Sequence, residues 1–224
     1  MKKTVLFLLT MSLILTATAQ EAKPPIKGKP SEEIENLQLA NQLARYGYKT
    51  FSATALIEAA KILSSVTTKE LSFDSYNQEP AGTTQAPKKT NERYDLQSIL
   101  DAAKKYADGD ADLLFDINEV EKSSQATRGR VGGPGHKYSF VYGKSTDTYE
   151  ISFIVGELAE IAVRGDGDTD LDLRVFDSNG NLIVQDIDYT DACYVSWVPK
   201  WTGRYLVKII NQGPIMNNYA MITN

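Results

Sequence analysis

The sequence has few of the residues that build disulfide frameworks or nucleophilic sites. It contains one cysteine, Cys193, and one histidine, His136, among 224 residues. A single cysteine excludes an internal disulfide framework, and a Cys–His nucleophilic pair would require these two residues to meet. Cys193 alternates with Val195 and Trp197, so we expect it to be a small buried hydrophobe. Glycines around His136 predict a solvated loop and a surface histidine.

Long apolar runs are missing after the first residues. The chain starts with a lysine pair, an uncharged apolar run over residues 5–16 and the small residues Ala17-Thr18-Ala19. This order predicts a secretory signal peptide over residues 1–19, cleaved near Ala19-Gln20. The run is shorter than the roughly 20 residues that span a bilayer, and no cysteine follows for lipid attachment. We therefore expect an exported protein, periplasmic or extracellular, without a membrane span.

Basic residues are scarce in the C-terminal half. From Tyr138 onward the chain carries 12 acidic and 6 basic residues. Without Lys2 and Lys3 the whole chain has 22 basic residues against 29 acidic ones. Nucleic acids and anionic membrane surfaces attract positive patches. The composition therefore argues against a nucleic-acid partner and favours a cation or a basic partner surface.

The segment 32–122 has the apolar spacing of helices. Residues 20–31, before it, are rich in proline and lysine and predict a flexible N-terminus. Apolar residues three and four apart then predict three or four helices, one of them from about Asp95 to Ala107 and a short last one over Leu113–Val120. Residues 72–93 have no apolar period and predict a loop or linker.

The apolar period changes to two from Lys137 onward. Apolar and polar residues alternate in Tyr149–Val155, Leu171–Val175 and Tyr205–Ile209, with glycine, aspartate and asparagine turns between such runs. Alternation of this kind predicts strands with one buried face. Seven or eight short strands within residues 137–224 predict a jelly-roll-like antiparallel sandwich. The predicted fold class is α+β, a helical N-terminal segment followed by an all-β domain.

Two motifs are more specific than this alternation. Residues 164–182 (RGDGDTDLDLRVFDSNGNL) combine a glycine–aspartate turn, an alternating strand and an Asp-x-Asn-Gly hairpin, and residues 201–205 (WTGRY) form an aromatic–Thr-Gly turn. Together they resemble the bacterial pre-peptidase C-terminal domain family, which includes the collagen-binding domains of bacterial collagenases, over residues 137–224 only. The resemblance implies a sandwich attached to secreted bacterial proteins, sometimes binding calcium and sometimes matrix polymers. Only a helical segment and a linker precede it here, so targeting of a tethered enzyme is not implied.

Aspartates recur at every second position of the glycine–aspartate turn: Asp166, Asp168, Asp170 and Asp172. In an extended strand their Cα atoms lie about 6.5–7 Å apart, too far to share one ion unless the chain curls. Glycines in the turn permit curling, and calcium takes about six to eight oxygen ligands. Acids of the next long loop that could complete a shell are Asp186, Asp188 and Asp191. Empty carboxylates repel by only about 1 kcal/mol per close pair in water, so a calcium site and a solvated turn both stay open.

A second acidic stretch, residues 108–112, follows the third predicted helix. Acids occupy the charged positions of an EF-hand loop counted from Asp108, but Leu113 stands where that loop requires glycine. We interpret the stretch as a helix–turn–helix with acids at the start of the second helix, where the helix dipole favours them.

The sequence predicts a binding role, because no residue set meets the requirements of an active site. We expect an exported, non-enzymatic binding or interaction protein whose sandwich recognises a protein, a polysaccharide or another matrix polymer, with calcium as the candidate cofactor. Trp201, beside a turn, either stacks on such a ligand or packs on its own turn. Two alternatives stay open: a secreted hydrolase with paired carboxylates, which needs a cleft and one raised pKa, and a structural subunit of a cell-envelope assembly.

Overall fold

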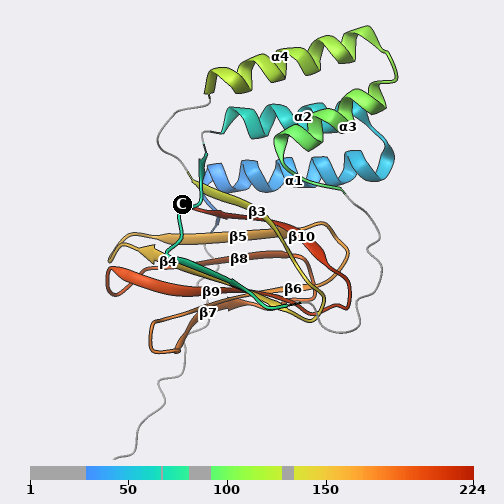
Figure 1. Cartoon of the computed structure of the whole chain (residues 1–224). Coiled ribbons are helices and arrows are strands. Elements are labelled where there is room, and N and C mark those ends of the chain that lie inside the picture. Colours follow the sequence, from blue (N-terminus) through green and yellow to red (C-terminus); the bar gives the residue numbers. More distant parts are fainter. Residues whose placement is uncertain (1–28, 67, 81–91, 128–133) are drawn as a thin grey trace, which may run out of the picture.

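A computed structural model describes residues 29–66, 68–80, 92–127 and 134–224. The signal peptide predicted over residues 1–19 lies outside the described residues. The protein has three layers, with the helices lying on one β-sheet and a second sheet beneath it (Figure 1). The predicted α+β class, helices first and then an antiparallel sandwich, is confirmed.

The first two helices form a closely packed pair. They are α1 (Glu32–Thr50) and α2 (Ala53–Ser65). Gly47 lies inside α1, and a Cβ atom at this position would come within 2.7 Å of the Leu56 side chain. Glycine therefore permits the close approach of the two helices. The hydroxyl of Ser52 caps α2 by accepting a backbone N–H of its first turn at 3.2 Å.

The acidic stretch 108–112 joins α3 (Leu96–Ala107) to α4 (Ala111–Thr127). Asp108 ends α3 in the left-handed conformation. Asp110 Oδ1 accepts the backbone N–H groups of Asp112 at 3.0 Å and Leu113 at 3.1 Å. The stretch is thus a helix–turn–helix, as the sequence predicted.

The fourth helix is longer than the short one predicted over residues 113–120. Its apolar contacts with the other helices end at Val120, which is why the apolar period did not extend further. Beyond that point Glu121 pairs with Lys104 of α3 at 2.6 Å, and Lys122 pairs with Glu119 at 2.7 Å. Ion pairs of this kind support helical turns without an apolar stripe.

The described chain contains two five-stranded sheets, sheet A in the order β1-β3-β10-β5-β8 and sheet B in the order β2-β4-β9-β6-β7. All pairings are antiparallel except that of β1 with β3. The strands within the predicted sandwich are β3 (Gly135–Val141), β4 (Thr146–Phe153), β5 (Ala159–Gly165), β6 (Leu171–Phe176), β7 (Leu182–Asp186), β8 (Ala192–Trp197), β9 (Gly203–Asn211) and β10 (Asn217–Thr223). Most connections between consecutive strands cross from one sheet to the other.

The segment predicted as a loop over residues 72–93 contains a strand. This strand, β2 (Ser75–Gln78), pairs with β4 at the edge of sheet B, and the two-residue strand β1 (Lys69–Glu70) pairs with β3. The sequence of β2 is mostly exposed and carries no apolar alternation. Only the free edge of β4 decides that this polar stretch is extended.

The sandwich core is aliphatic and aromatic, and its largest fully buried side chains include Tyr149, Tyr205 and Tyr219. Cys193 is buried among them, as predicted, and its thiol donates to the carbonyl of Leu171 at 3.0 Å. Burial raises the pKa of this thiol far above its usual range. Cys193 is therefore a core residue and its thiol stays protonated at neutral pH.

The prediction that His136 lies in a solvated loop is wrong. It lies in β3, where it pairs with Glu70 of β1 and Ile222 of β10, and it is half-buried. Burial lowers the pKa of its imidazole. In sheet A, β10 and β5 separate β3 from β8, which carries Cys193. The two residues therefore do not form a Cys–His pair.

The helices dock on the outer face of sheet A (Figure 1). Ile34 and Leu37 of α1 pack against Ala162 of β5 and Ile222 of β10, and all four are buried. At the start of α1 the buried carboxylate of Glu160 accepts the backbone N–H of Ser31 at 3.0 Å and the Tyr194 hydroxyl at 2.6 Å. An anion at a helix N-terminus is stabilised by the helix dipole. The sequence had left this docking open.

None of the helices within the described ranges combines the length and the apolar character that a bilayer-crossing segment needs.

Candidate functional site

A cleft of about 570 Å³ opens where the edge of the sandwich meets the helical layer. Its walls come from segments far apart in the sequence: β2, β3, the start of β10 and the residues that lead into α3. The aromatic lining residues are Phe73, Tyr76, Tyr94, Tyr138, Phe140 and Tyr219. The polar lining residues are Gln78, Arg93, Asp95, Lys137, Ser139 and Asn218. Concave sites with aromatic walls and a few polar groups are typical of ligand pockets.

The aromatic wall of the cleft is built on Tyr149. The ring of Tyr76 stacks on it with centroids 4.7 Å apart, and Phe73 meets it edge-on at 5.4 Å. Tyr76 is 40% exposed, so this ring is available to a ligand while Tyr149 is buried behind it. The ammonium of Lys137 lies 5.8 Å from the centre of the Phe73 ring, a cation–π distance.

Charges around the cleft are balanced. Arg93 Nε lies 3.6 Å from the Asp95 carboxylate, and Lys137 Nζ lies 3.9 Å from that of Glu70. The segment that carries Arg93 and Asp95 is held in place, because Tyr48 donates its hydroxyl to the Arg93 carbonyl at 2.7 Å. Exposed pairs of this kind are weak. The cleft therefore has no field of one sign that would select an ion.

A buried carboxylate lies behind the cleft. Asp147 of β4 is fully buried, and its Oδ2 accepts the hydroxyls of Tyr219 at 2.6 Å and Tyr76 at 3.2 Å. Its Oδ1 has no hydrogen-bond partner among the described residues. Burial raises the pKa of this carboxyl, while the tyrosine hydrogen bonds favour the anion and oppose the rise. Two lining tyrosines are thus fixed by one residue that is not itself part of the cleft lining.

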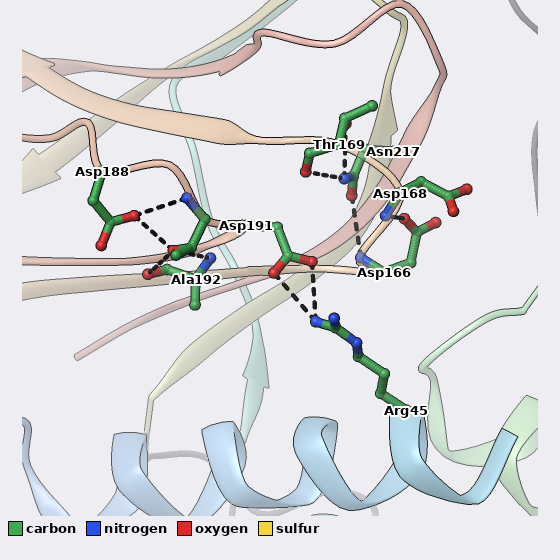
Figure 2. Close-up of polar contacts among 9 residues, drawn as sticks. Arg45, Asp166, Asp168, Thr169, Asp188, Asp191, Ala192 and Asn217 are labelled. Atoms are coloured by element: carbon green, nitrogen blue, oxygen red, sulfur yellow. Dashed lines mark hydrogen bonds and ion pairs between the residues drawn. The ribbon is translucent and has the colours of Figure 1, made fainter. Parts of the chain in front are cut away.

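The predicted acidic turn lies elsewhere, between β5 and β6 (Figure 2). Asp166 is buried, and its carboxylate accepts the N–H groups of Asp168 at 3.2 Å and Asn218 at 2.9 Å. Figure 2 shows Arg45 reaching from α1 to Asp191, with Nη1 3.3 Å from the nearer carboxylate oxygen. Asp191 lies in the loop before β8, so this ion pair joins that loop of the sandwich to α1.

Like Asp166, two further predicted calcium ligands are bonded within the protein. Asp172 is buried beside Arg174 at 3.2 Å and Gln212 at 2.7 Å. Asp188 accepts the hydroxyl of Thr190 at 2.6 Å within its own loop. Across the described part of the chain, no group of three His, Cys, Asp or Glu side chains has an arrangement that would hold a metal ion.

Two of the predicted calcium ligands, Asp168 and Asp170, line an open pocket of about 530 Å³ together with Arg45, Arg164 and Asp191. Asp170 Oδ1 is buried and has no hydrogen-bond partner in the described structure. Burial raises the pKa of this carboxyl, and the charges of neighbouring aspartates raise it further. A calcium ion near Asp170 stays a prediction from the sequence.

Trp201 is positioned by its own turn. Its ring stacks on Tyr205 with centroids 5.4 Å apart and planes 13° apart, and 37% of it is exposed. Its carbonyl also accepts the Tyr205 hydroxyl at 3.3 Å. The packing role foreseen for Trp201 is present, and a ligand role stays a prediction.

No family model and no curated protein matches this chain. Solved structures similar to it include a mitogen from Yersinia pseudotuberculosis, with a TM-score of 0.36 and 13% identity over 42% of this chain and 86% of that one. Another is the pre-peptidase C-terminal domain of a collagenase from Bacillus anthracis, with a TM-score of 0.34 and 13% identity over 42% of this chain and 92% of that one. A third is the Aeromonas hydrophila periplasmic inhibitor of g-type lysozyme, with a TM-score of 0.32 and 13% identity over 41% and 84%. Similarities this low carry no inference about function, so the site is argued from its own geometry.

Replacing Asp170 by asparagine should stabilise the protein in the absence of calcium. Its raised pKa means that the folded state disfavours the ionised form, so above that pKa the charge lowers the free energy of unfolding. We expect Asp170→Asn to add about 1 kcal/mol at pH 7. The gain should shrink as acid neutralises Asp170 in the wild type. Thermal melts in EDTA at pH 7 and pH 3.5 measure this.

The control for this variant is Glu157→Gln, which removes one exposed negative charge and should leave the melting temperature nearly unchanged. A fall in the melting temperature of Asp170→Asn in EDTA would contradict this prediction, because it would show that the charge of Asp170 stabilises the folded state. If calcium binds at the turn, added calcium should raise the melting temperature of the wild type and not that of Asp170→Asn.

Sequence reasoning missed the cleft because no local pattern marks it. Asp147 did carry a signal: it shares the inward phase of Tyr149, Ile151 and Phe153, and a charged residue at a core position is unusual. Tyr219 and Tyr76 had no comparable signal. Only the pairing of β2 with β4, and the packing of sheet A on sheet B, brings them together.

Proposed function

We propose that this chain is an exported, non-enzymatic binding protein whose ligand occupies the cleft between β2, β3, β10 and the segment leading into α3. The observation that carries the proposal is the cleft itself, about 570 Å³ in volume, with aromatic walls and dispersed polar groups. This size lies within the range of about 300–1,000 Å³ for small-molecule sites. Export rests on the signal peptide predicted from the sequence.

The walls of the cleft are suited to recognition because they are fixed before a ligand arrives. Tyr219 is buried by the core and bonded to Asp147, and Gln78 donates its amide to the Phe140 carbonyl at 2.7 Å. Tyr76 is stacked on a buried ring. Preformed walls avoid part of the ordering cost of binding. A ligand segment with an apolar face and polar edges fits this lining.

Replacing Tyr76 by alanine should lower the affinity of any ligand of the cleft by about tenfold, because an aromatic contact contributes about 0.5–1.5 kcal/mol beyond its buried area. A thermal-shift screen of saccharides, peptides, amino acids and nucleosides against the wild type identifies ligands, and calorimetry on the variant tests the site. The matched control is Tyr46→Ala, an exposed tyrosine of α1 that does not line the cleft.

The proposal fails if every ligand found binds Tyr76→Ala and the wild type equally. The hydrolase alternative would be supported instead if the protein turned over a substrate in this screen and lost that activity on replacement of a single aspartate. The export part is tested separately: the N-terminus of protein recovered outside the cytoplasm should begin near Gln20.

A further inference from the structure

The tyrosine hydroxyls of the cleft donate their hydrogen bonds to other groups of the protein. Tyr219 and Tyr76 both bond to Oδ2 of Asp147, at 2.6 and 3.2 Å. A carboxylate can only accept, so each hydroxyl must be the donor. Tyr219 is 2% exposed and Tyr76 is 40% exposed, so a ligand meets mainly Tyr76, whose oxygen keeps an accepting lone pair.

A third tyrosine extends this chain and fixes its direction. Tyr149 Oη lies 2.6 Å from Tyr219 Oη. Because the Tyr219 hydroxyl already donates its hydrogen bond to Asp147, Tyr149 must donate to Tyr219. The hydrogen bonds therefore run in one direction toward the carboxylate, and successive bonds of such a chain strengthen one another.

The amide side chains of the cleft also donate hydrogen bonds to other groups of the protein. Gln78 donates one N–H to the carbonyl of Phe140 at 2.7 Å, and Asn218 donates one to the carbonyl of Glu92 at 2.8 Å. Each amide keeps one further N–H, while its accepting oxygen is not used in these bonds. The uncharged polar groups of the cleft thus offer mainly acceptors.

We propose that the cleft selects a saccharide, and that Asp147 is the positioning residue that holds its tyrosines as acceptors. This inference rests on the proposed function and adds the chemical class of the ligand. A sugar ring offers a C–H face to an aromatic ring such as Tyr76 and hydroxyl donors to the oxygens beside it. The balanced charges of Arg93, Asp95 and Lys137 suit a neutral ligand.

A peptide fits this lining less well. An extended backbone offers donors and acceptors in equal number, so half of its polar groups would need donors, and the charged donors of the lining, Arg93 and Lys137, are already paired with Asp95 and Glu70. Buried polar groups left without partners cost about 1–3 kcal/mol each. Hydroxyl groups avoid this cost because one hydroxyl can both donate and accept.

The test uses the full mature chain with five hexasaccharides: cellohexaose, xylohexaose, laminarihexaose, maltohexaose and chitohexaose. Each is compared by calorimetry with its permethylated form, which keeps the rings and acceptors but has no hydroxyl donor. We expect at least one hexasaccharide to bind and its permethylated form to bind about tenfold more weakly or less, since a lost hydrogen bond in a desolvated site costs about 1.4 kcal/mol.

Asp147→Asn provides the decisive comparison. An asparagine can donate as well as accept, so the tyrosine protons are no longer all directed away from the cleft. We expect the ratio of affinities for the free and permethylated saccharide to fall several-fold, a readout that a loss of stability alone would not change. Should Asp147→Asn fail to fold, Tyr76→Phe replaces it. That variant keeps the ring and should lose affinity only for the hydroxylated ligand.

The possible results separate the inference from the proposed function. Equal binding of free and permethylated saccharides overturns the inference. So does a screen in which peptides bind the cleft and no hexasaccharide does, although binding by the cleft then still stands. If Tyr76→Ala changes the affinity of no ligand of any class, the proposed function itself fails.

Discussion

Ala162→Asp should lower the free energy of unfolding by at least about 3 kcal/mol, because it places a charge in the interface that joins the helices to the sandwich. Ala162 of β5 is 1% exposed and lies against Ile34 and Leu37 of α1. The four buried side chains of this contact are all apolar and offer a carboxylate no partner. Denaturant unfolding followed by circular dichroism measures the loss.

The control for this change is Ala111→Asp. Ala111 is exposed in the first turn of α4, where a negative charge is favoured by the helix dipole. The same substitution should therefore leave stability within about 0.5 kcal/mol of the wild type. If Ala162→Asp were as stable as Ala111→Asp, the helices would not dock on sheet A as described.

Asn217→Ala should cost about 2–4 kcal/mol, because it leaves two backbone groups of the acidic turn without their partner. Asn217 is fully buried at the start of β10. Its Oδ1 accepts the N–H of Asp166 at 3.1 Å, and its Nδ2 donates to the carbonyl and the hydroxyl of Thr169 at 3.0 Å (Figure 2). Hydrogen exchange should then show faster opening of residues 166–170.

Asn118→Ala is the matched control, since Asn118 is exposed on α4 and its removal should change stability by less than about 0.5 kcal/mol. If the stability of Asn217→Ala lay within that margin, water would be replacing Asn217 as the hydrogen-bond partner of the turn, and the predicted loss would be wrong. The result also bears on the calcium prediction, because a turn already held by Asn217 does not need an ion for its shape.

The sequence by itself determined the elements whose side chains alternate or repeat strongly. The helical period ended and the period of two began near Lys137, and the two layers of strands formed from there as predicted. Turn chemistry was equally local: Asp177 accepts the N–H groups of Asn179 and Asn181 at 2.8 Å, as a hairpin of this composition requires. Burial of Cys193 followed from its place in an alternating run.

The tertiary structure alone decided the features that arise from pairing between distant segments. β2 is extended because the edge of β4 accepts it, and His136 is half-buried because β1 and β10 flank its strand. The cleft likewise exists only where β2, β3 and β10 meet the segment before α3. Local patterns record which face of an element is apolar. They do not record which distant backbone will pair with the edge of a sheet, and that choice brought Tyr76 to Asp147.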